Sequence, residues 1–201
     1  MEQFHMLKKL ALSTLCFHLF AAGLLVGAEN IKWIFQNVVY IPQNDGYSCT
    51  TTSVAMAISY YKNLDKPLDK DTVWKISGID EQTVYEIGND MEGLKRIANH
   101  YGFKSKFAEN MEIADVEHLL SKGMLVMLNI KGWTAPTHAV LVIGYDKNKK
   151  IFHINDPANR KNKVLEYSDL ETRWSTYLSS PKGNSYRSGF IIYPDGFLEK
   201  D

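Results

Sequence analysis

Cysteine is scarce in this chain, and neither sign of charge dominates it. The 201 residues contain two cysteines, and lysine plus arginine equal aspartate plus glutamate at 23 each. Without an excess of charge there is no broad electrostatic field to attract nucleic acid or an anionic membrane surface, so we expect neither as a partner of the mature protein. Internal repeats, low-complexity runs and linkers rich in Pro, Gly or Ser are also lacking. Their absence argues against a repeat array or a string of domains.

A long hydrophobic run occurs near the N-terminus. Lys8-Lys9 precede the apolar stretch Leu10–Val26, and Val26-Gly27-Ala28 offers small residues of the kind at which a signal peptidase cuts. We therefore predict that residues 1–28 are a secretory signal peptide. The mature protein, residues 29–201, is then exported from a bacterial-type cell to the periplasm or the medium. An uncleaved membrane anchor is the alternative, because the stretch approaches the ~20 residues that span a bilayer.

Residues 29–201 are enough for one hydrophobic core, and we predict a single domain. Apolar residues at helical spacing predict helices over residues 50–63, 71–77, 91–101 and 113–122. Short extended runs then predict strands over residues 124–130, 139–145, 151–155, 163–167 and 190–193. Helices followed by an antiparallel sheet indicate an α+β fold, with the N-terminal helical part packed against the sheet.

Removal of the signal peptide would leave Cys49 as the only thiol. A single cysteine cannot form an internal disulfide, so it must be buried and inert, paired between chains, or reactive. Cys49 lies at the predicted N-terminus of the first helix, where hydroxyl groups at Ser48, Thr50 and Thr51 can cap free amides. A helix N-terminus and an imidazolium neighbour both favour a reactive thiolate, and this position therefore favours the reactive alternative.

A histidine and an aspartate are predicted to lie side by side near this thiol. The polar turn 146–150 joins two predicted strands, which should therefore pair as a hairpin. Pairing centred on Lys147 sets His138 directly opposite Asp156, with Cβ atoms ~4.5–5.5 Å apart on the same face of the sheet. His138 would take the proton of Cys49, and Asp156 would orient the ring and stabilise its charged form.

Gln43 precedes the cysteine in a loop that must return to the helix start. Its side-chain amide can join the backbone N–H of Cys49 as a donor to a developing oxyanion. Each candidate also has an ordinary structural alternative: a buried cysteine, a structural histidine beside an apolar strand, and a turn aspartate before Pro157. The ordered set of four favours a catalytic site over separate structural roles.

These motifs resemble those of the double-glycine leader peptidases that mature bacteriocins, and of their stand-alone relatives among the papain-like cysteine peptidases. The resemblance covers residues 39–194 and implies a papain-like α+β fold. It also implies that Cys49 is the nucleophile, His138 the base, Asp156 the orienting acid and Gln43 the oxyanion donor. The motifs are Gln43-x5-Cys49, His138-Ala139-Val140-Leu141-Val142-Ile143-Gly144-Tyr145 and Asn155-Asp156-Pro157-Ala158.

The chain departs from the resembled family in two respects. Thr50 follows the cysteine, where the family often has glycine. No membrane spans or nucleotide-binding motif follow the domain, unlike in the peptidases fused to transporters. A double-glycine leader is therefore not carried over as the substrate.

We expect an exported cysteine peptidase that hydrolyses a peptide or isopeptide bond of a peptide or protein substrate through a thioester. No cofactor is expected, and His100, His118 and His153 lack the spacing of a metal site. Two alternatives stay open: a thiol acyltransferase or transpeptidase of the same fold, and a catalytically silent peptide-binding domain. Trp133 is predicted to shield the His138–Asp156 pair, to line a substrate groove or to cap the core. The oligomeric state is not indicated by the sequence.

Overall fold

The computed structural model describes residues 31–82, 91–158, 160–174, 178–180 and 183–195. Trp33–Asp201 forms one compact unit. The predicted signal peptide lies outside the described residues, so its cleavage and the boundary at residue 28 stay predictions. Within the described ranges, no helix is both long enough and apolar enough to cross a bilayer.

The four predicted helices are confirmed, with ends that differ slightly from the predicted ones. Apolar positions on one face of each helix are buried, as the helical spacing required. Gly78, with φ of 65°, supplies the left-handed residue that ends the second of these helices. A further helix follows the sixth strand, at residues predicted as the end of a strand and a loop. The helices are α2 (Cys49–Tyr61), α3 (Lys70–Ser77), α5 (Met91–His100), α6 (Ile113–Ser121) and α7 (Tyr167–Trp174).

The main sheet is antiparallel and has the strand order β2-β9-β3-β4-β5-β6, with β1 beside β4. The five predicted strands are confirmed, whereas β1, β2, β7 and β8 were not predicted because they are short or carry alternating lysines. A separate two-stranded sheet pairs β7 with β8. The strands are β1 (Trp33–Phe35), β2 (Phe103–Ala108), β3 (Leu125–Ile130), β4 (His138–Asp146), β5 (Ile151–Asp156), β6 (Arg160–Glu166), β7 (Leu178–Ser180), β8 (Gly183–Ser185) and β9 (Gly189–Pro194).

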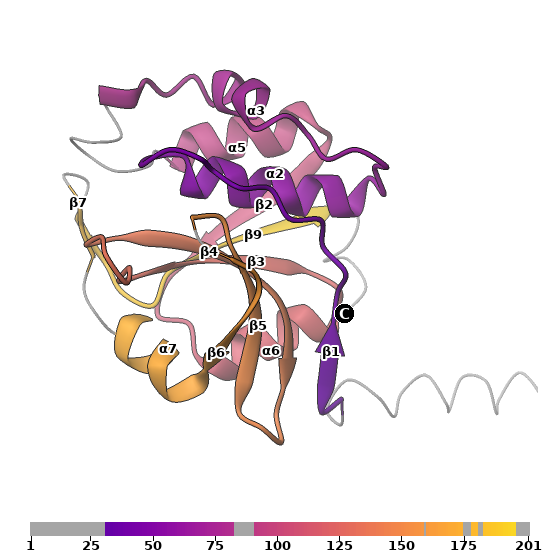
Figure 1. Cartoon of the computed structure of the whole chain (residues 1–201), viewed down its shortest axis with the longest axis vertical. Coiled ribbons are helices and arrows are strands. Elements are labelled where there is room, and N and C mark those ends of the chain that lie inside the picture. The colour runs from indigo at the N-terminus through magenta and orange to yellow at the C-terminus, as the bar shows by residue number, and fades with distance from the viewer. Residues whose placement is uncertain (1–30, 83–90, 159, 175–177, 181–182, 196–201) are drawn as a thin grey trace, which may run out of the picture. The chain divides into compact units, whose positions relative to one another are not determined.

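Helices cover both faces of the sheet. Figure 1 shows α2, α3 and α5 on one side, and α6 and α7 on the other. α2 packs on β3, β4 and β9, while α6 and α7 both contact β3 from the opposite side. Residues 125–128 of β3 and 139–143 of β4 are therefore at most 1% exposed. The predicted α+β fold, with a helical part packed on an antiparallel sheet, is confirmed.

The register of the β4–β5 hairpin differs from the predicted one. Asp146 pairs with Ile151, because Asp146 stays in the strand and its carboxylate accepts the backbone N–H groups of Asn148 and Lys149. The turn therefore consists of residues 147–150, and the pairing of β4 with β5 is centred between Asn148 and Lys149 instead of on Lys147. The predicted direct opposition of His138 and Asp156 is wrong.

A bulge in β4 keeps the two side chains within reach of each other despite this shift. The register changes between Val142 and Gly144, and Leu141 then pairs with Asn155. One step further along this register sets Asp156 opposite Val140. His138, two residues from Val140, is the diagonal neighbour of Asp156 on the same face, a separation that long side chains bridge.

β1 pairs with the end of β4 that lies away from His138, and because the two strands are antiparallel the chain then runs back toward the His138 end of β4. A Cβ atom on Gly144 would lie 2.3 Å from the carbonyl oxygen of Ile34, so only glycine permits this close approach of β1 to β4. Further along, the backbone N–H of Gln43 donates to the carbonyl of Pro157 at 2.9 Å. The loop that precedes α2 is thereby fastened to the end of β5.

Candidate active site

Cys49 is the first residue of α2, and its side chain is partly exposed. The residues that follow it, Thr50 to Ser59, are all buried, because α2 lies between the sheet on one side and α3 and α5 on the other. The helix is thus fixed in place while its first residue remains accessible. This is the arrangement that a nucleophile at a helix N-terminus requires.

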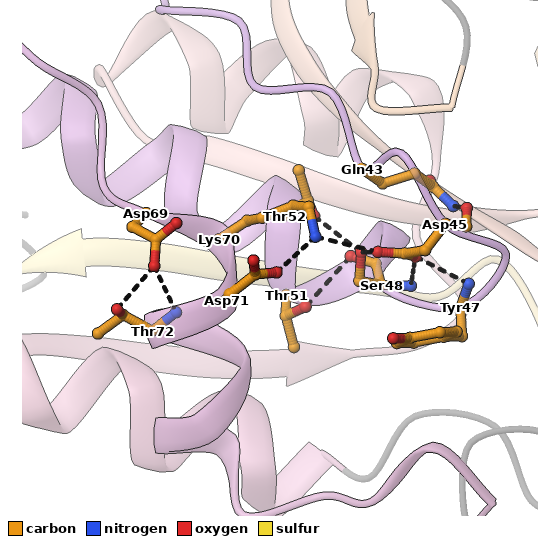
Figure 2. Close-up of polar contacts among 10 residues, drawn as sticks. All are labelled: Gln43, Asp45, Tyr47, Ser48, Thr51, Thr52, Asp69, Lys70, Asp71 and Thr72. Atoms are coloured by element: carbon orange, nitrogen blue, oxygen red, sulfur yellow. Dashed lines mark hydrogen bonds and ion pairs between the residues drawn. The ribbon is translucent and has the colours of Figure 1, made fainter.

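Asp45 organises the loop that leads into α2 (Figure 2). Its Oδ1 accepts the backbone N–H groups of Tyr47 at 3.0 Å and Ser48 at 2.8 Å. Its Oδ2 accepts the hydroxyl of Ser48 at 2.7 Å and pairs with Lys70 Nζ, at the start of α3, at 3.2 Å. Burial alone would raise the pKa of Asp45, but the hydrogen bonds from Ser48 and Tyr47 outweigh it and lower this pKa.

The predicted hydroxyl caps are therefore wrong. The Ser48 side chain makes no hydrogen bond to a backbone N–H of α2, and the Thr51 hydroxyl donates to the Ser48 carbonyl at 3.1 Å. Asp45, three residues before Ser48, instead accepts the backbone N–H groups of Tyr47 and Ser48 in the loop. Asp45 was not predicted from the sequence, although Asp followed by Gly at a turn before a helix is a signal for such side-chain to backbone bonds.

Gln43 is 5% exposed and lies against this loop. Its Nε2 donates to the carbonyl oxygen of Asp45 at 2.5 Å. This bond fixes which end of the amide carries the donors, and a primary amide has a second N–H to offer. Among the described residues, Gln43 Oε1 is buried without a hydrogen-bond partner. Gln43 thus lies in the loop that precedes Cys49, where the sequence analysis expected it.

His138 and Asp156 form a direct hydrogen bond at the other side of the site. His138 Nε2 donates to Asp156 Oδ1 at 2.7 Å, and the side chain of Asp156 is 1% exposed. The backbone N–H of Ala158 also donates to this Oδ1, at 3.1 Å. Burial alone would raise the pKa of Asp156, but the hydrogen bond with His138, together with Lys163 and other neighbours, lowers it.

The imidazole of His138 also interacts with Cys49. Burial alone would lower the pKa of His138, but the hydrogen bonds with Asp156 and with Cys49 outweigh burial and raise this pKa to about 9. Since Nε2 is engaged by Asp156, Nδ1 is the nitrogen left for the thiol. The structure therefore brings together Cys49, His138 and Asp156 in the order sulfur, imidazole, carboxylate.

A layer of aromatic and basic side chains adjoins this pair. The Trp133 ring lies edge-on to the His138 ring, with centroids 6.3 Å apart and planes at 75°. Lys163 Nζ lies 3.1 Å from the centre of the Trp133 ring and 3.7 Å from Asp156 Oδ2. The guanidinium carbon of Arg173 lies 4.5 Å from the same ring. Lys163 and Arg173 were not singled out from the sequence, because their proximity depends on how β6 and α7 pack.

No three His, Cys, Asp or Glu side chains gather closely enough to hold a metal ion within the ranges that the structure describes. His100, His118 and His153 lie on α5, α6 and β5 respectively. The candidate residues supply a thiol, an imidazole, a carboxylate and an amide, a set of groups that suits nucleophilic acyl transfer.

Three solved structures share the fold of this chain. A double glycine motif protease from an AMS/PCAT transporter, solved in complex with the leader peptide, has a TM-score of 0.58 and 18% identity over 80% of this chain and 94% of its own. The peptidase domain of Streptococcus ComA, a bi-functional ABC transporter, has a TM-score of 0.58 and 16% identity over 77% of this chain and 97% of its own. A protein from Bacillus anthracis described as a C39-like peptidase has a TM-score of 0.56 and 16% identity over 80% of this chain and 97% of its own.

These likenesses confirm the predicted papain-like fold. None of the curated proteins matches the chain. The model of the Peptidase_C39 like family, however, matches residues 35–180, which include all four candidate site residues. The resemblance seen in the sequence motifs is thereby confirmed: the chain belongs to the Peptidase_C39 like family.

Proposed function

We propose that this protein is a cysteine peptidase that hydrolyses a peptide or isopeptide bond through a thioester, with no cofactor. The observation that carries the proposal is that His138 is hydrogen-bonded to Asp156 at 2.7 Å and also interacts with Cys49, the first residue of a buried helix. A thiol at this position that meets an oriented imidazole is the arrangement for nucleophilic acyl transfer.

His138 moves the proton in both halves of the reaction. It holds the proton taken from the Cys49 thiol, so that the sulfur attacks the substrate carbonyl as a thiolate, and it gives this proton to the departing amine when the C–N bond breaks. A water molecule then attacks the thioester with His138 as base, and Cys49 regains its proton as the acid product leaves. Asp156 stays ionised throughout and keeps Nδ1 directed at the sulfur.

The oxyanion that forms in each half is assigned to two donors. The backbone N–H of Cys49 belongs to the first turn of α2, where amides have no partner within the helix. The second donor is the N–H of Gln43 that does not bind Asp45. The hydrogen bond to the Asp45 carbonyl supports this role. It fixes the rotation of the Gln43 amide, so that the nitrogen and not the oxygen faces the Asp45 carbonyl.

A peptide is the proposed substrate class. The structural neighbour from the AMS/PCAT transporter was solved with a leader peptide bound, which supports peptide recognition by this fold. The apolar N-terminal stretch supports action outside the cytoplasm, in the periplasm or the medium, after residues 1–28 are removed. An uncleaved anchor would place the same domain at a membrane surface.

The proposal is tested by incubating purified residues 29–201 and the Cys49→Ala variant with a peptide library and analysing both by mass spectrometry. We expect cleaved peptides and an acyl adduct on Cys49 in the unmodified protein only. Cleavage that persists in Cys49→Ala would contradict the mechanism. Products joined to an added amine would indicate an acyltransferase, and a protein that neither cleaves peptides nor forms an adduct would indicate a silent binding domain.

A further inference from the structure

Among the described residues, one oxygen of the Asp156 carboxylate accepts hydrogen bonds and the other accepts none. Oδ1 accepts from His138 at 2.7 Å and from the backbone of Ala158 at 3.1 Å. Oδ2 is buried and, within the described residues, accepts no hydrogen bond. A buried anionic oxygen of this kind is unfavourable unless a charge compensates it. The group placed to do so is the ammonium of Lys163, whose Nζ lies 3.7 Å from Oδ2.

The pairing of β6 with β5 and the ring of Trp133 together restrict the position of Lys163. Its strand, β6, pairs Lys163 with Ile154, two residues before Asp156. Its Nζ lies 3.1 Å from the centre of the Trp133 ring, which attracts a cation through the ring face. The Lys163 side chain is 22% exposed, so the ammonium keeps some contact with water while its position is restricted.

Trp133 and the residues before it contact α7 through Arg173. The guanidinium of Arg173 lies over the Trp133 ring, donates to the carbonyls of Lys131 at 3.4 Å and Gly132 at 3.3 Å, and pairs with Asp169 at 2.9 Å. The backbone N–H of Lys131 donates in turn to the carbonyl of Arg173 at 3.0 Å. The segment immediately before Trp133 is thus tied to the end of α7.

We propose that Lys163 is a positioning residue of this site, which compensates the buried oxygen of Asp156 and limits how strongly that carboxylate holds the proton on His138. The inference rests on the proposed function, because it concerns the same proton transfers. An uncompensated carboxylate would stabilise the imidazolium further, and His138 would then release its proton to the leaving amine less readily.

Charged and titratable groups face His138 and Asp156, or the Trp133 ring beside them, from four parts of the fold. Cys49 faces His138 from α2, and Lys163 faces Asp156 from β6. The hydroxyl of Tyr40, in the segment after β1, donates to the carbonyl of Asp156 at 3.2 Å. Arg173, from α7, reaches the ring of Trp133. The cation on Lys163 is therefore the charge whose removal should act most directly on Asp156.

The test compares three variants at two positions of β6. Lys163→Met keeps an alkyl stem over Trp133 and removes the charge, whereas Lys163→Arg keeps the charge. Lys161→Met removes a charge from an exposed residue of the same strand and serves as the matched control. For each we measure the pH dependence of Cys49 alkylation and of peptide cleavage, with the midpoint of unfolding as a check on folding.

We expect Lys163→Met to move the alkaline limb of both pH profiles upward by about 0.5–1 pH unit and to lower kcat by about threefold to tenfold, with a smaller effect on KM. Lys163→Arg should restore the profile, and Lys161→Met should match the unmodified protein. If Lys163→Met fails to fold, Lys163→Gln takes its place.

An unmoved alkaline limb in Lys163→Met, or an equal shift in Lys161→Met, would overturn the role of Lys163. The alkylation profile needs no substrate, so it tests Lys163 even if the protein cleaves no peptide. Absence of cleavage by the unmodified protein would count against the proposed function alone.

Discussion

The two sides of the candidate site are built differently. On the nucleophile side, Gln43, Asp45 and Cys49 lie within one short stretch, in which Asp45 makes hydrogen bonds with Gln43 and Ser48. On the base side, His138 and Asp156 come from separate strands, and a loop, a third strand and a helix complete their surroundings. The nucleophile side therefore depends on local hydrogen bonds, and the base side depends on the register of the sheet and the packing around it.

This difference predicts how each side responds to mutation. Changes on the nucleophile side should act through the loop that orients Cys49 and Gln43. Changes on the base side should act through the charge and position of His138.

The largest effect is expected from His138→Ala, which removes the base. We expect kcat/KM for peptide cleavage to fall by about 10²–10⁴-fold, the range associated with general acid–base catalysis. His153→Ala is the control, because His153 lies in the same hairpin but packs edge-on against Phe35. Equal losses in the two variants would indicate that the hairpin, rather than the imidazole of His138, had been damaged.

Gln43→Ala removes the proposed oxyanion donor from the nucleophile side. A lost donor of this type lowers kcat by about 10²–10³-fold, and KM should change little because the donor acts on the charge that develops during reaction. Steady-state kinetics would separate the two parameters. A variant with unchanged kcat and a raised KM would show that Gln43 binds substrate instead.

Asp45→Ala removes the carboxylate that holds the loop before α2. We expect the free energy of unfolding to fall by about 2 kcal/mol, because hydrogen bonds to a charged group are lost together with their ordering effect. Asp71→Ala is the matched control: this exposed carboxylate pairs with the same Lys70 at 2.6 Å, and its loss should cost under ~1 kcal/mol. Denaturant unfolding of both variants would show whether the loop depends on Asp45 as proposed.

The base side should show a pH-dependent contribution to stability. The pKa of His138 is raised from 6.5 to about 9 in the fold, so folding favours the protonated ring. That contribution is fully present below about pH 6.5 and is lost as the pH rises through about 9. The difference in unfolding free energy between the unmodified protein and His138→Ala should therefore shrink by about 1 kcal/mol or more between pH ~6 and pH ~10. A difference that grew with pH would contradict the raised pKa.

The sequence predicted the nucleophile side better because its information is local. The helical spacing of Val54, Ala57, Ile58 and Tyr61 placed Cys49 at a helix start, and α2 does begin at Cys49. Asp45 was missed because the hydroxyls next to the helix were expected to bind the free amides, whereas this carboxylate binds the backbone N–H groups of Tyr47 and Ser48 in the preceding loop. This error is also local, and the Asp-Gly pair before the helix could have corrected it.

On the base side, the contact between His138 and Asp156 was predicted, but the register of the hairpin that carries them was not. Turn length alone centred the hairpin on Lys147, whereas the structure keeps Asp146 in the strand and adds a bulge near Ile143. Neither feature has a signal in the pattern of apolar residues. Lys163 and Arg173 could not be predicted at all, because their meeting at Trp133 requires β6 and α7 to be placed on the sheet.

The most direct test of the account is the rate at which a mild alkylating reagent modifies Cys49 at neutral pH, compared between the unmodified protein, His138→Ala and His153→Ala. We predict rapid modification of the unmodified protein and of His153→Ala, and at least about tenfold slower modification of His138→Ala, because the imidazole no longer takes the thiol proton. Equal rates in all three proteins would show that Cys49 and His138 do not act together, and the proposed peptidase mechanism would be wrong.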